Sequence, residues 1–210
     1  MTKVFFSVTM SLDGFIAPAS RADDPDQQRW FAQWMQLQRY VFDQKFFREL
    51  LKLGEGGETG EDNRFLEQTF QRTGVTIIGK RMFDAGEHAW PEEAPFHSPV
   101  FVVTNQVRSP WERLGGTTFH FVNDGIESAL RQARAVAGGK DIRIGGGADT
   151  IRQYLDAGVV DEFALAVSPV FLGAGIRLFD GIAPSVALVI AKVVHSPKVT
   201  HLSYTVRREP

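Results

Sequence analysis

Short apolar runs alternate with amphipathic segments through most of the chain, and turn residues separate them. Val4–Ser11 is rich in β-branched and aromatic residues and ends at the turn pair Asp13-Gly14, so it predicts a first strand. Val75–Ile78 and Pro99–Thr104 are apolar or β-branched almost throughout, which is typical of strands buried on both faces of a sheet. Further strands are predicted at Thr117–Val122, Ile142–Ile144 and Glu162–Ser168.

Helical periodicity fills most of the gaps between these strands. A helical region is predicted from about Trp30 to Leu53, and shorter helices at Arg64–Thr73 and Asp149–Ala157. The clearest helix is Asp124–Ala137, whose apolar residues share one face. Asp124 and Glu127 have the spacing of a capping box at its start, and Gly138-Gly139 ends it.

The chain closes with two long strands, Val186–His195 and Val199–Arg207, that form a hairpin around Ser196-Pro197. Alternating strands and helices followed by an antiparallel pair predict a layered α/β fold on a mixed, mostly parallel sheet. Ligands are then expected at the carboxyl ends of the strands. Two polar segments, Pro18–Gln28 and Leu53–Asp62, interrupt the pattern. The second has four Gly and four acids, which predicts a surface loop or lid that buries nothing.

Composition removes several classes of protein. A chain of 210 residues with 43% hydrophobic residues is expected to form one domain over residues 1–210 with a full core. A net charge of −2 without a Lys/Arg run argues against nucleic-acid and membrane-surface binding. No run reaches the roughly 18 apolar residues of a membrane span, and no signal peptide is recognised, so a cytoplasmic location is expected. The absence of Cys excludes thiol nucleophiles and thiolate metal sites, so redox chemistry would need a borrowed electron source.

Three predicted strand ends carry glycines, hydroxyls and basic residues. The first has Gly79, Lys80, Arg81 and Met82; the second has Thr104, Asn105 and Arg108; the third has Gly145, Gly146, Gly147, Ala148, Asp149 and Thr150. Glycine lets a backbone approach a phosphate closely, and a helix N-terminus then binds the anion through its free N–H groups. These strand ends indicate a site for a polyanionic cofactor, although a glycine run is also compatible with a simple strand–helix turn.

The second strand end also distinguishes two nicotinamide cofactors. A strand that binds an unphosphorylated ribose usually ends in Asp or Glu, whereas this one offers Thr104, Asn105 and a nearby Arg. A 2′-phosphate is therefore expected, which favours NADPH over NADH.

Two carboxylates are candidate catalytic groups. Asp43 falls within the apolar arc of the predicted helix, where a carboxylate is costly unless it is paired, protonated or used. It is a candidate to anchor or protonate a substrate; alternatively it caps a helix or pairs with Arg39. Asp13 is the second candidate, although Asp-Gly after a strand is usually a turn. The five His form no ligand pair, so they are expected to be structural or exposed, and no metal site is expected.

Five segments in this order resemble the dihydrofolate reductase-like superfamily, and in particular the reductase domain of riboflavin biosynthesis and its stand-alone bacterial relatives. They are VTMSLDGFIA, IIGKRMFD, VFVVTN, IRIGGGADTIRQYL and VDEFALAVSPVFLGAGIRLFD. The resemblance covers nearly the whole chain. It implies the three-layer dihydrofolate reductase fold, NADPH as hydride donor and a homodimer.

By position, the resemblance also implies roles for individual residues. Gly79–Met82 would lie against the diphosphate and adenosine, Thr104 and Asn105 beside the 2′-phosphate, and Gly145–Thr150 around the diphosphate. In the family, a cis peptide sometimes joins the first two glycines of that run. Ile16 and Ala17 would border the nicotinamide, and Val8 and Thr9 would line the substrate pocket.

The substrate half of the resemblance is incomplete. The Leu-Pro-Trp turn of true dihydrofolate reductases is absent, and Gly86–Trp90 stands where riboflavin reductases carry Asp-Asp-Pro. The sequence therefore predicts an NADPH-dependent reductase of a pterin, pyrimidine or similar heterocycle without naming the substrate. A nucleotide-binding module without turnover and a reductase that uses a deazaflavin-type cofactor are the alternatives.

Overall fold

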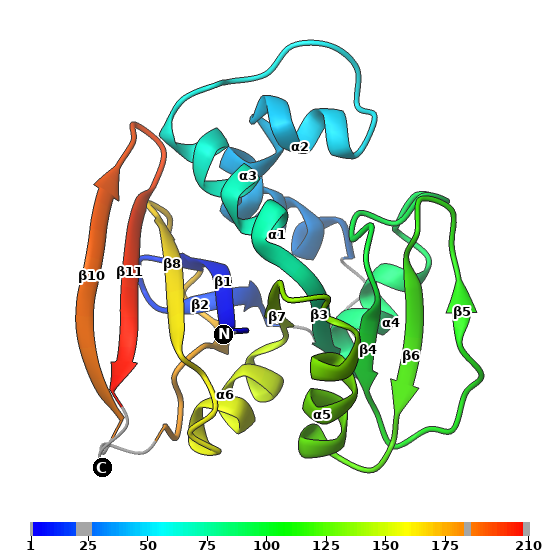
Figure 1. Ribbon diagram of the computed structural model, residues 1–210. Coiled ribbons are helices and arrows are strands. Elements are labelled where there is room, and N and C mark those ends of the chain that lie inside the picture. Colours follow the sequence, from blue (N-terminus) through cyan, green and yellow to red (C-terminus); the bar gives the residue numbers. More distant parts are fainter. Residues whose placement is uncertain (1, 20–26, 183–185, 208–210) are drawn as a thin grey trace.

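A computed structural model describes residues 2–19, 27–182 and 186–207 of the chain. Within these ranges, nine strands form one sheet in the order β10-β11-β8-β1-β7-β3-β4-β6-β5, and β2 and β9 form a small second sheet (Figure 1). The strands are β1 (Val4–Ser11), β2 (Phe15–Pro18), β3 (Thr73–Gly79), β4 (Val100–Val103), β5 (Trp111–Glu112), β6 (Thr118–Val122), β7 (Asp141–Gly146), β8 (Glu162–Ser168), β9 (Gly175–Arg177), β10 (Ala187–His195) and β11 (Thr200–Arg207). The helices are α1 (Gln27–Phe42), α2 (Lys45–Leu50), α3 (Glu61–Arg72), α4 (Lys80–Glu87), α5 (Ile126–Val136) and α6 (Ala148–Asp156).

The predicted mixed sheet is confirmed. The central strands β8, β1, β7, β3, β4 and β6 are all parallel to one another. The C-terminal hairpin of β10 and β11 joins antiparallel at the β8 edge, and β5 is antiparallel to β6 at the other.

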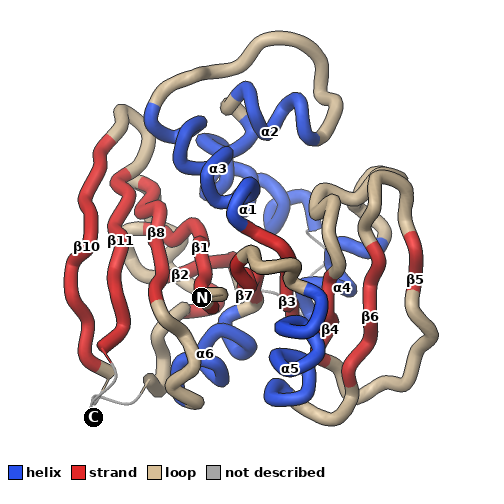
Figure 2. Tube along the Cα trace, viewed as in Figure 1, coloured by secondary structure: helices blue, strands red, loops and turns tan. Residues whose placement is uncertain are grey.

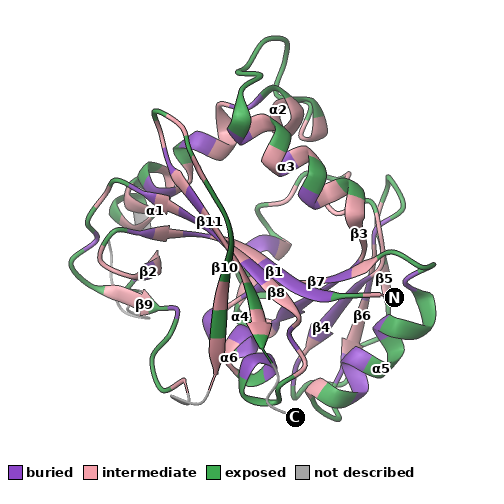
Figure 3. Ribbon diagram, turned by 60° about the vertical axis from the view of Figure 1, so that its left-hand side comes forward, coloured by how far each residue is buried: buried purple, intermediate pink, exposed green. Residues whose placement is uncertain are grey.

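Helices cover both faces of the sheet, so the fold has three layers. Ile77 and Ile144 pack against α5 and α6 in the main core, whereas Ile78 packs with Phe83 of α4 on the opposite face. Phe70 of α3 lies over Arg143, on the face opposite to the main core. Figure 3 shows α1, α2 and α3 on one side of the sheet and α5 and α6 on the other. We call the side of α1, α3 and α4 the upper face.

The single helical region predicted from Trp30 to Leu53 is wrong, because the helix breaks at Asp43-Gln44. Gln44 has extended backbone (φ −80°, ψ 137°) and is buried. The returning loop pairs with this break: Lys45 N–H donates to the Glu58 carbonyl at 2.9 Å, and Glu58 N–H donates to the Asp43 carbonyl at 2.8 Å. The continuous apolar arc that was to contain Asp43 therefore does not form.

The glycine-rich segment Leu53–Asp62 is a loop over most of its length, and Figure 2 traces it between α2 and α3. The prediction that it buries nothing is wrong at its end, since α3 begins at Glu61 and Asp62 is only 4% exposed. Asp62 Oδ1 lies 2.7 Å from Nε2 of His201, which is also buried, and Asp62 Oδ2 accepts from Ser196 Oγ at 2.8 Å. These bonds fasten α3 to the C-terminal hairpin.

Short elements depart from the prediction in other places. The helix α4 and the strands β2, β5 and β9 are additional, because elements this short carry little periodicity. The predicted capping box is wrong: Gly125, with φ 97°, is the N-cap of α5, and no side chain caps it within the described residues. Most of the polar segment Pro18–Gln28 lies outside the described residues.

None of the helices in the described residues combines the length and the apolar composition that a bilayer-spanning segment requires.

Candidate functional site

Two helices begin side by side at the carboxyl ends of adjacent parallel strands. β3 ends at Gly79, the N-cap of α4, and β7 ends at Gly146, followed by Gly147, the N-cap of α6. Ile78 is the register partner of Gly146, so the two strand ends lie level. Both N-caps are glycines, so they have no side chain that could cap the first-turn N–H groups of the helices. Free N–H groups and two positive dipole ends therefore face the same region.

Glycine is required where these two helices meet. A Cβ on Gly79 would collide with Oγ1 of Thr150 and lie 3.7 Å from the Gly147 nitrogen. At Gly147 a Cβ would meet no atom of the described residues within 4 Å, so the space in front of this residue is open with respect to them. The cis peptide joins Gly146 to Gly147, so the prediction that it joins the first two glycines of the run is wrong. The glycines thus provide a close backbone junction with an open approach.

The remaining predicted strand end, that of β4, lies next to this junction. Val103, the last residue of β4, is the register partner of Gly79. Thr104 follows it and is buried, and its Oγ1 accepts from Gln106 N–H at 3.1 Å. Asn105 is exposed beside it. The predicted convergence of the three strand ends is therefore confirmed.

The three predicted basic residues are each paired with a carboxylate. Lys80 Nζ lies 2.6 Å from Asp84, Arg81 Nη1 lies 3.2 Å from Asp149, and Arg108 Nη2 lies 2.6 Å from Glu87. The sequence interpretation counted only the cations, so it overestimated the positive charge of this region. A bound phosphate would have to share these bases with the carboxylates or displace the carboxylates from them.

Arg108 is held more tightly than the other two bases. Its guanidinium lies over the rings of Phe121 at 4.7 Å, Phe83 at 5.2 Å and Trp111 at 5.5 Å. Its hydrogen bond to Glu87 is the main cause that lowers the pKa of that carboxyl. Arg108 therefore belongs to an aromatic box beside β6.

Ile16 and Ala17 lie on β2, at the same end of the molecule as the turn after β1. Ala17 pairs with Ile176 of β9, and Ile16 packs against the main core. Gly175 approaches Ala17 so closely that a Cβ on the glycine would collide with the Ala17 carbonyl oxygen. The small β2–β9 sheet thus joins the segment after β1 to the segment after β8.

Asp13 strengthens the same connection. Its carboxylate accepts from Ser11 Oγ at 2.6 Å, from Gly173 N–H at 2.7 Å and from Leu172 N–H at 3.2 Å. Desolvation opposes ionisation, but these hydrogen bonds outweigh it and lower the pKa of Asp13. A carboxyl that stays ionised is a poor proton donor at neutral pH.

The structure brings Asp43 together with charged residues of the hairpin and loop. Its carboxylate forms an ion pair and hydrogen bond with Lys198, and Lys198 Nζ also lies 2.7 Å from Glu58. Arg39 is more distant, at 4.0 Å. Because Gln44 rather than Asp43 is the N-cap of α2, the capping alternative is wrong.

Val8 and Thr9 point to opposite faces of β1. Val8 packs against the main core, whereas buried Thr9 faces α1. Thr9 Oγ1 donates to Gln38 Oε1 at 2.9 Å and lies 3.3 Å from the Tyr40 hydroxyl. Burial raises the pKa of Tyr40 to about 12, so this hydroxyl keeps its proton at neutral pH. The sequence interpretation missed Tyr40, which has no distinguishing motif.

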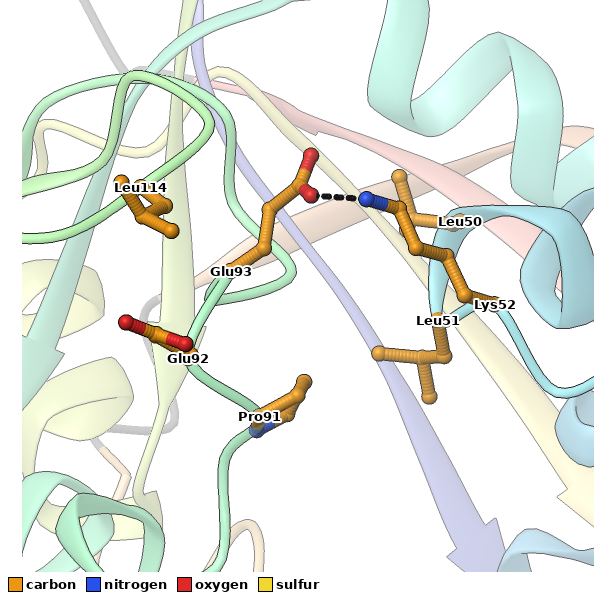
Figure 4. A pocket seen from close by; sticks show the side chains of 7 residues that line it. All are labelled: Leu50, Leu51, Lys52, Pro91, Glu92, Glu93 and Leu114. Carbon is orange, nitrogen blue, oxygen red and sulfur yellow. Dashed lines mark hydrogen bonds and ion pairs between the residues drawn. The ribbon is translucent and has the colours of Figure 1, made fainter.

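Two cavities lie away from the glycine junction. One of about 270 Å³ lies between α2 and the segments that precede β4 and β6, and an ion pair between Lys52 and Glu93 crosses it (Figure 4). It is near the amino ends of the strands, the edge opposite to Gly79 and Gly147. A second, of about 230 Å³, lies between α3 and the strands β1, β8, β11 and β10. Neither is lined by a glycine of the junction.

The model of the RibD C-terminal domain family matches residues 2–202. Two curated relatives come from Bacillus subtilis (strain 168), and both are called uncharacterized. YyaP is 42% identical over 59 residues, which are 28% of this chain and 31% of that protein. YwjB is 29% identical over 120 residues, which are 57% of this chain and 66% of that protein. The matches thus span about one third and just under two thirds of the lengths of these relatives.

Solved structures share the fold. A putative riboflavin biosynthesis protein from Shewanella sp. PV-4 has a TM-score of 0.67 and 18% identity, over 99% of this chain and 100% of that one. A diaminohydroxyphosphoribosylaminopyrimidine deaminase/5-amino-6-(5-phosphoribosylamino)uracil reductase from Thermotoga maritima has a TM-score of 0.61 and 14% identity, over 98% of this chain and 57% of that one. These neighbours confirm the predicted dihydrofolate reductase-like fold. Because the family model covers nearly the whole sequence, the chain belongs to the RibD C-terminal domain family.

Proposed function

We propose that this protein is an NADPH-dependent reductase that transfers hydride to a pterin, a pyrimidine or a similar heterocycle in the cytoplasm. The observation that carries the proposal is the glycine junction: two adjacent helix N-termini, opened by Gly79 and Gly147, with an open approach at Gly147. Such an arrangement suits the diphosphate of a dinucleotide, since backbone N–H groups and helix dipoles favour an anion there. Membership of a family with a reductase fold supports the same reaction class.

The described residues fit this cofactor. The first-turn amides of α4 and α6 would hold the diphosphate, and Arg81 would exchange Asp149 for a phosphate oxygen. Thr104 and Asn105 would flank the 2′-phosphate, and β2 would border the nicotinamide through Ile16. When bound, NADPH supplies the hydride. The chain itself would orient the ring and exclude water.

The proton needed by the reduced ring has three candidate sources. Asp13 is disfavoured by its lowered pKa, and Asp43 is already paired with Lys198. An ordered water is therefore the proposed source, and Asp43 remains the side-chain alternative.

We also propose a homodimer. The edge strand β10 exposes Leu188, Ile190 and Val193, which are 46%, 66% and 55% exposed. A long edge strand with exposed apolar side chains readily pairs with another chain. Sedimentation analysis of the protein and of the variant Ile190→Glu tests this: a dimer that the variant weakens is expected, and a wild-type monomer at micromolar concentration would refute it.

The reductase proposal is tested by adding NADPH and NADH to the purified protein and recording tryptophan fluorescence and the melting temperature. NADPH at about a hundred times its dissociation constant should stabilise the fold by roughly 2.7 kcal/mol, and NADH should be less effective. Oxidation of NADPH is then followed with a panel of pterins and pyrimidines. No effect of NADPH at millimolar concentration would refute the proposal. Binding without turnover on any acceptor would favour a non-catalytic nucleotide-binding module.

A further inference from the structure

Arg143 lies in the middle of the sheet and faces α1 and α3. Its neighbours on β7, Ile142 and Ile144, are buried in the main core on the opposite face. Side chains alternate along a strand, so Arg143 and Gly145 point to the upper face. Gly145 begins the glycine run of the proposed cofactor site, which places Arg143 about 7 Å before it along the strand.

Among the described residues, the guanidinium of Arg143 has few partners. There, its buried Nε makes no hydrogen bond, and Nη2 donates only to the Ser7 carbonyl, at 3.4 Å. The ring of Phe70 lies 5.1 Å away. Across the residues that the structure describes, no carboxylate forms an ion pair with it. Burial lowers the pKa of Arg143 to about 10, so it is still charged at neutral pH.

A second arginine on the same face shows that the chain can neutralise such a charge. Arg72 of α3 forms ion pairs at 2.7 Å with both Asp141 and Glu162, and its guanidinium lies 4.0 Å from the ring of Phe5. Asp141 is only two residues before Arg143 on β7. A buried charge without a counter-ion is strongly destabilising, and unpaired charges of this kind are typical of binding sites.

The groups around Arg143 are suited to a polar ligand. Tyr40 is close enough for its hydroxyl and the Arg143 guanidinium to influence each other's pKa. The Tyr40 hydroxyl lies 3.3 Å from that of Thr9, which the family resemblance assigns to the substrate pocket. One unpaired cation and a protonated phenol therefore lie together beneath α1 and α3.

We propose that Arg143 binds a carboxylate of the acceptor substrate and so restricts the reductase to acidic heterocycles. This inference rests on the proposed function. A planar guanidinium pairs well with a planar carboxylate, and one cation balances its single negative charge. A phosphate monoester, with close to two negative charges at neutral pH, would leave charge uncompensated in a partly buried position.

Matched acceptor pairs test the proposal on the full chain: orotate against uracil, and pterin carboxylate against hydroxymethylpterin, each with NADPH present. The carboxylates should bind about tenfold or more tightly than their neutral partners. Arg143→Gln should abolish that preference and leave NADPH binding unchanged. The control Arg131→Gln, which removes a charge from the exposed side of α5, should retain the preference.

Stability provides a second readout. If Arg143 serves a ligand, Arg143→Met should leave the melting temperature of the free protein unchanged or raise it, because the variant removes an uncompensated charge. A large decrease would assign Arg143 to the fold and overturn the proposal.

Equal binding of acid and neutral partners, or a stronger preference for uridine monophosphate over uridine than for orotate over uracil, would also overturn it. If the wild type fails to bind NADPH at all, the proposed reductase function is what fails.

Discussion

The two parts of the candidate site are built in different ways. The glycine junction consists of backbone: Gly79 and Gly147 open two helices, and their N–H groups need no particular side chain. The region beneath α1 and α3 consists of side chains that converge from separate elements, namely Thr9 on β1, Tyr40 on α1 and Arg143 on β7. A backbone-built site tolerates a change of substrate, whereas a side-chain-built pocket specifies one. This difference fits the pattern in the sequence, where the glycine-rich strand ends match the family motifs but the Leu-Pro-Trp turn and the Asp-Asp-Pro segment are absent.

The largest effect is expected at the centre of the glycine junction. Gly79→Val would drive its side chain into Thr150, and we expect it to lower the free energy of unfolding by about 2–3 kcal/mol. The control is Gly60→Ala at the N-cap of α3, where the added carbon has no atom of the described residues within 4 Å. Denaturant titration of both variants measures the difference. Equal stability of the two would show that the junction is looser than described.

A smaller effect is expected when the ion pair between Arg72 and Glu162, at the amino end of the upper face, is removed. Glu162 is partly desolvated, which raises its pKa, but hydrogen bonds from Lys3 and Arg72 outweigh this and lower it. The stabilisation is therefore present above the unfolded-state pKa and is lost as the pH falls through the folded-state value. Glu162→Gln should cost on the order of 1 kcal/mol at pH 7.

This cost should shrink as the pH falls below the unfolded-state pKa of 4.5, and it should vanish below the lowered folded-state pKa, where the carboxyl is protonated in both states. Melting curves of wild type and Glu162→Gln between pH 7 and pH 3 check it, with the exposed Glu112→Gln as control. A difference that does not change with pH would contradict the role given to the ion pairs.

The smallest effect is expected for Asp43→Asn. Its carboxylate is about one third exposed and paired with Lys198, so its removal should cost less than about 1 kcal/mol. If the proton comes from water, turnover and its pH profile should be unchanged. A large loss of turnover at unchanged NADPH binding would instead assign the proton to Asp43 and move this residue into the substrate part of the site.

The contrast between the backbone-built junction and the side-chain-built region also explains which features of the site could be predicted from the sequence. Glycines at strand ends are local signals, so the convergence at Gly79, Thr104 and Gly147 was predictable from a parallel sheet. Charge pairing was not: Asp149 and Glu87 neutralise bases that lie far from them in sequence or on another element. The break at Gln44 involves a strand-like bridge with Glu58. Asp62 is buried in contact with His201, which lies 139 residues further along the chain.

Arg143 illustrates that the sequence shows where a charge lies in a strand but not whether that charge is paired. A lone arginine between Ile142 and Ile144 marks a charged position in an otherwise apolar strand. Whether that charge is paired depends on α3 and α1, which contribute Phe70 and Tyr40 but no carboxylate that pairs with it among the described residues. Tertiary contacts therefore decide its role.

The central claim, that the glycine junction holds a dinucleotide, is tested most directly by calorimetric titration of wild type and Gly147→Ala with NADPH. A methyl group at this position meets no atom of the residues that the structure describes, and the backbone there (φ −78°, ψ −168°) suits alanine, so the melting temperature should not change. The methyl would stand where the cofactor approaches, and we expect the affinity for NADPH to fall by about tenfold or more. Equal affinity of the two proteins, or no binding of NADPH by the wild type, would contradict the account.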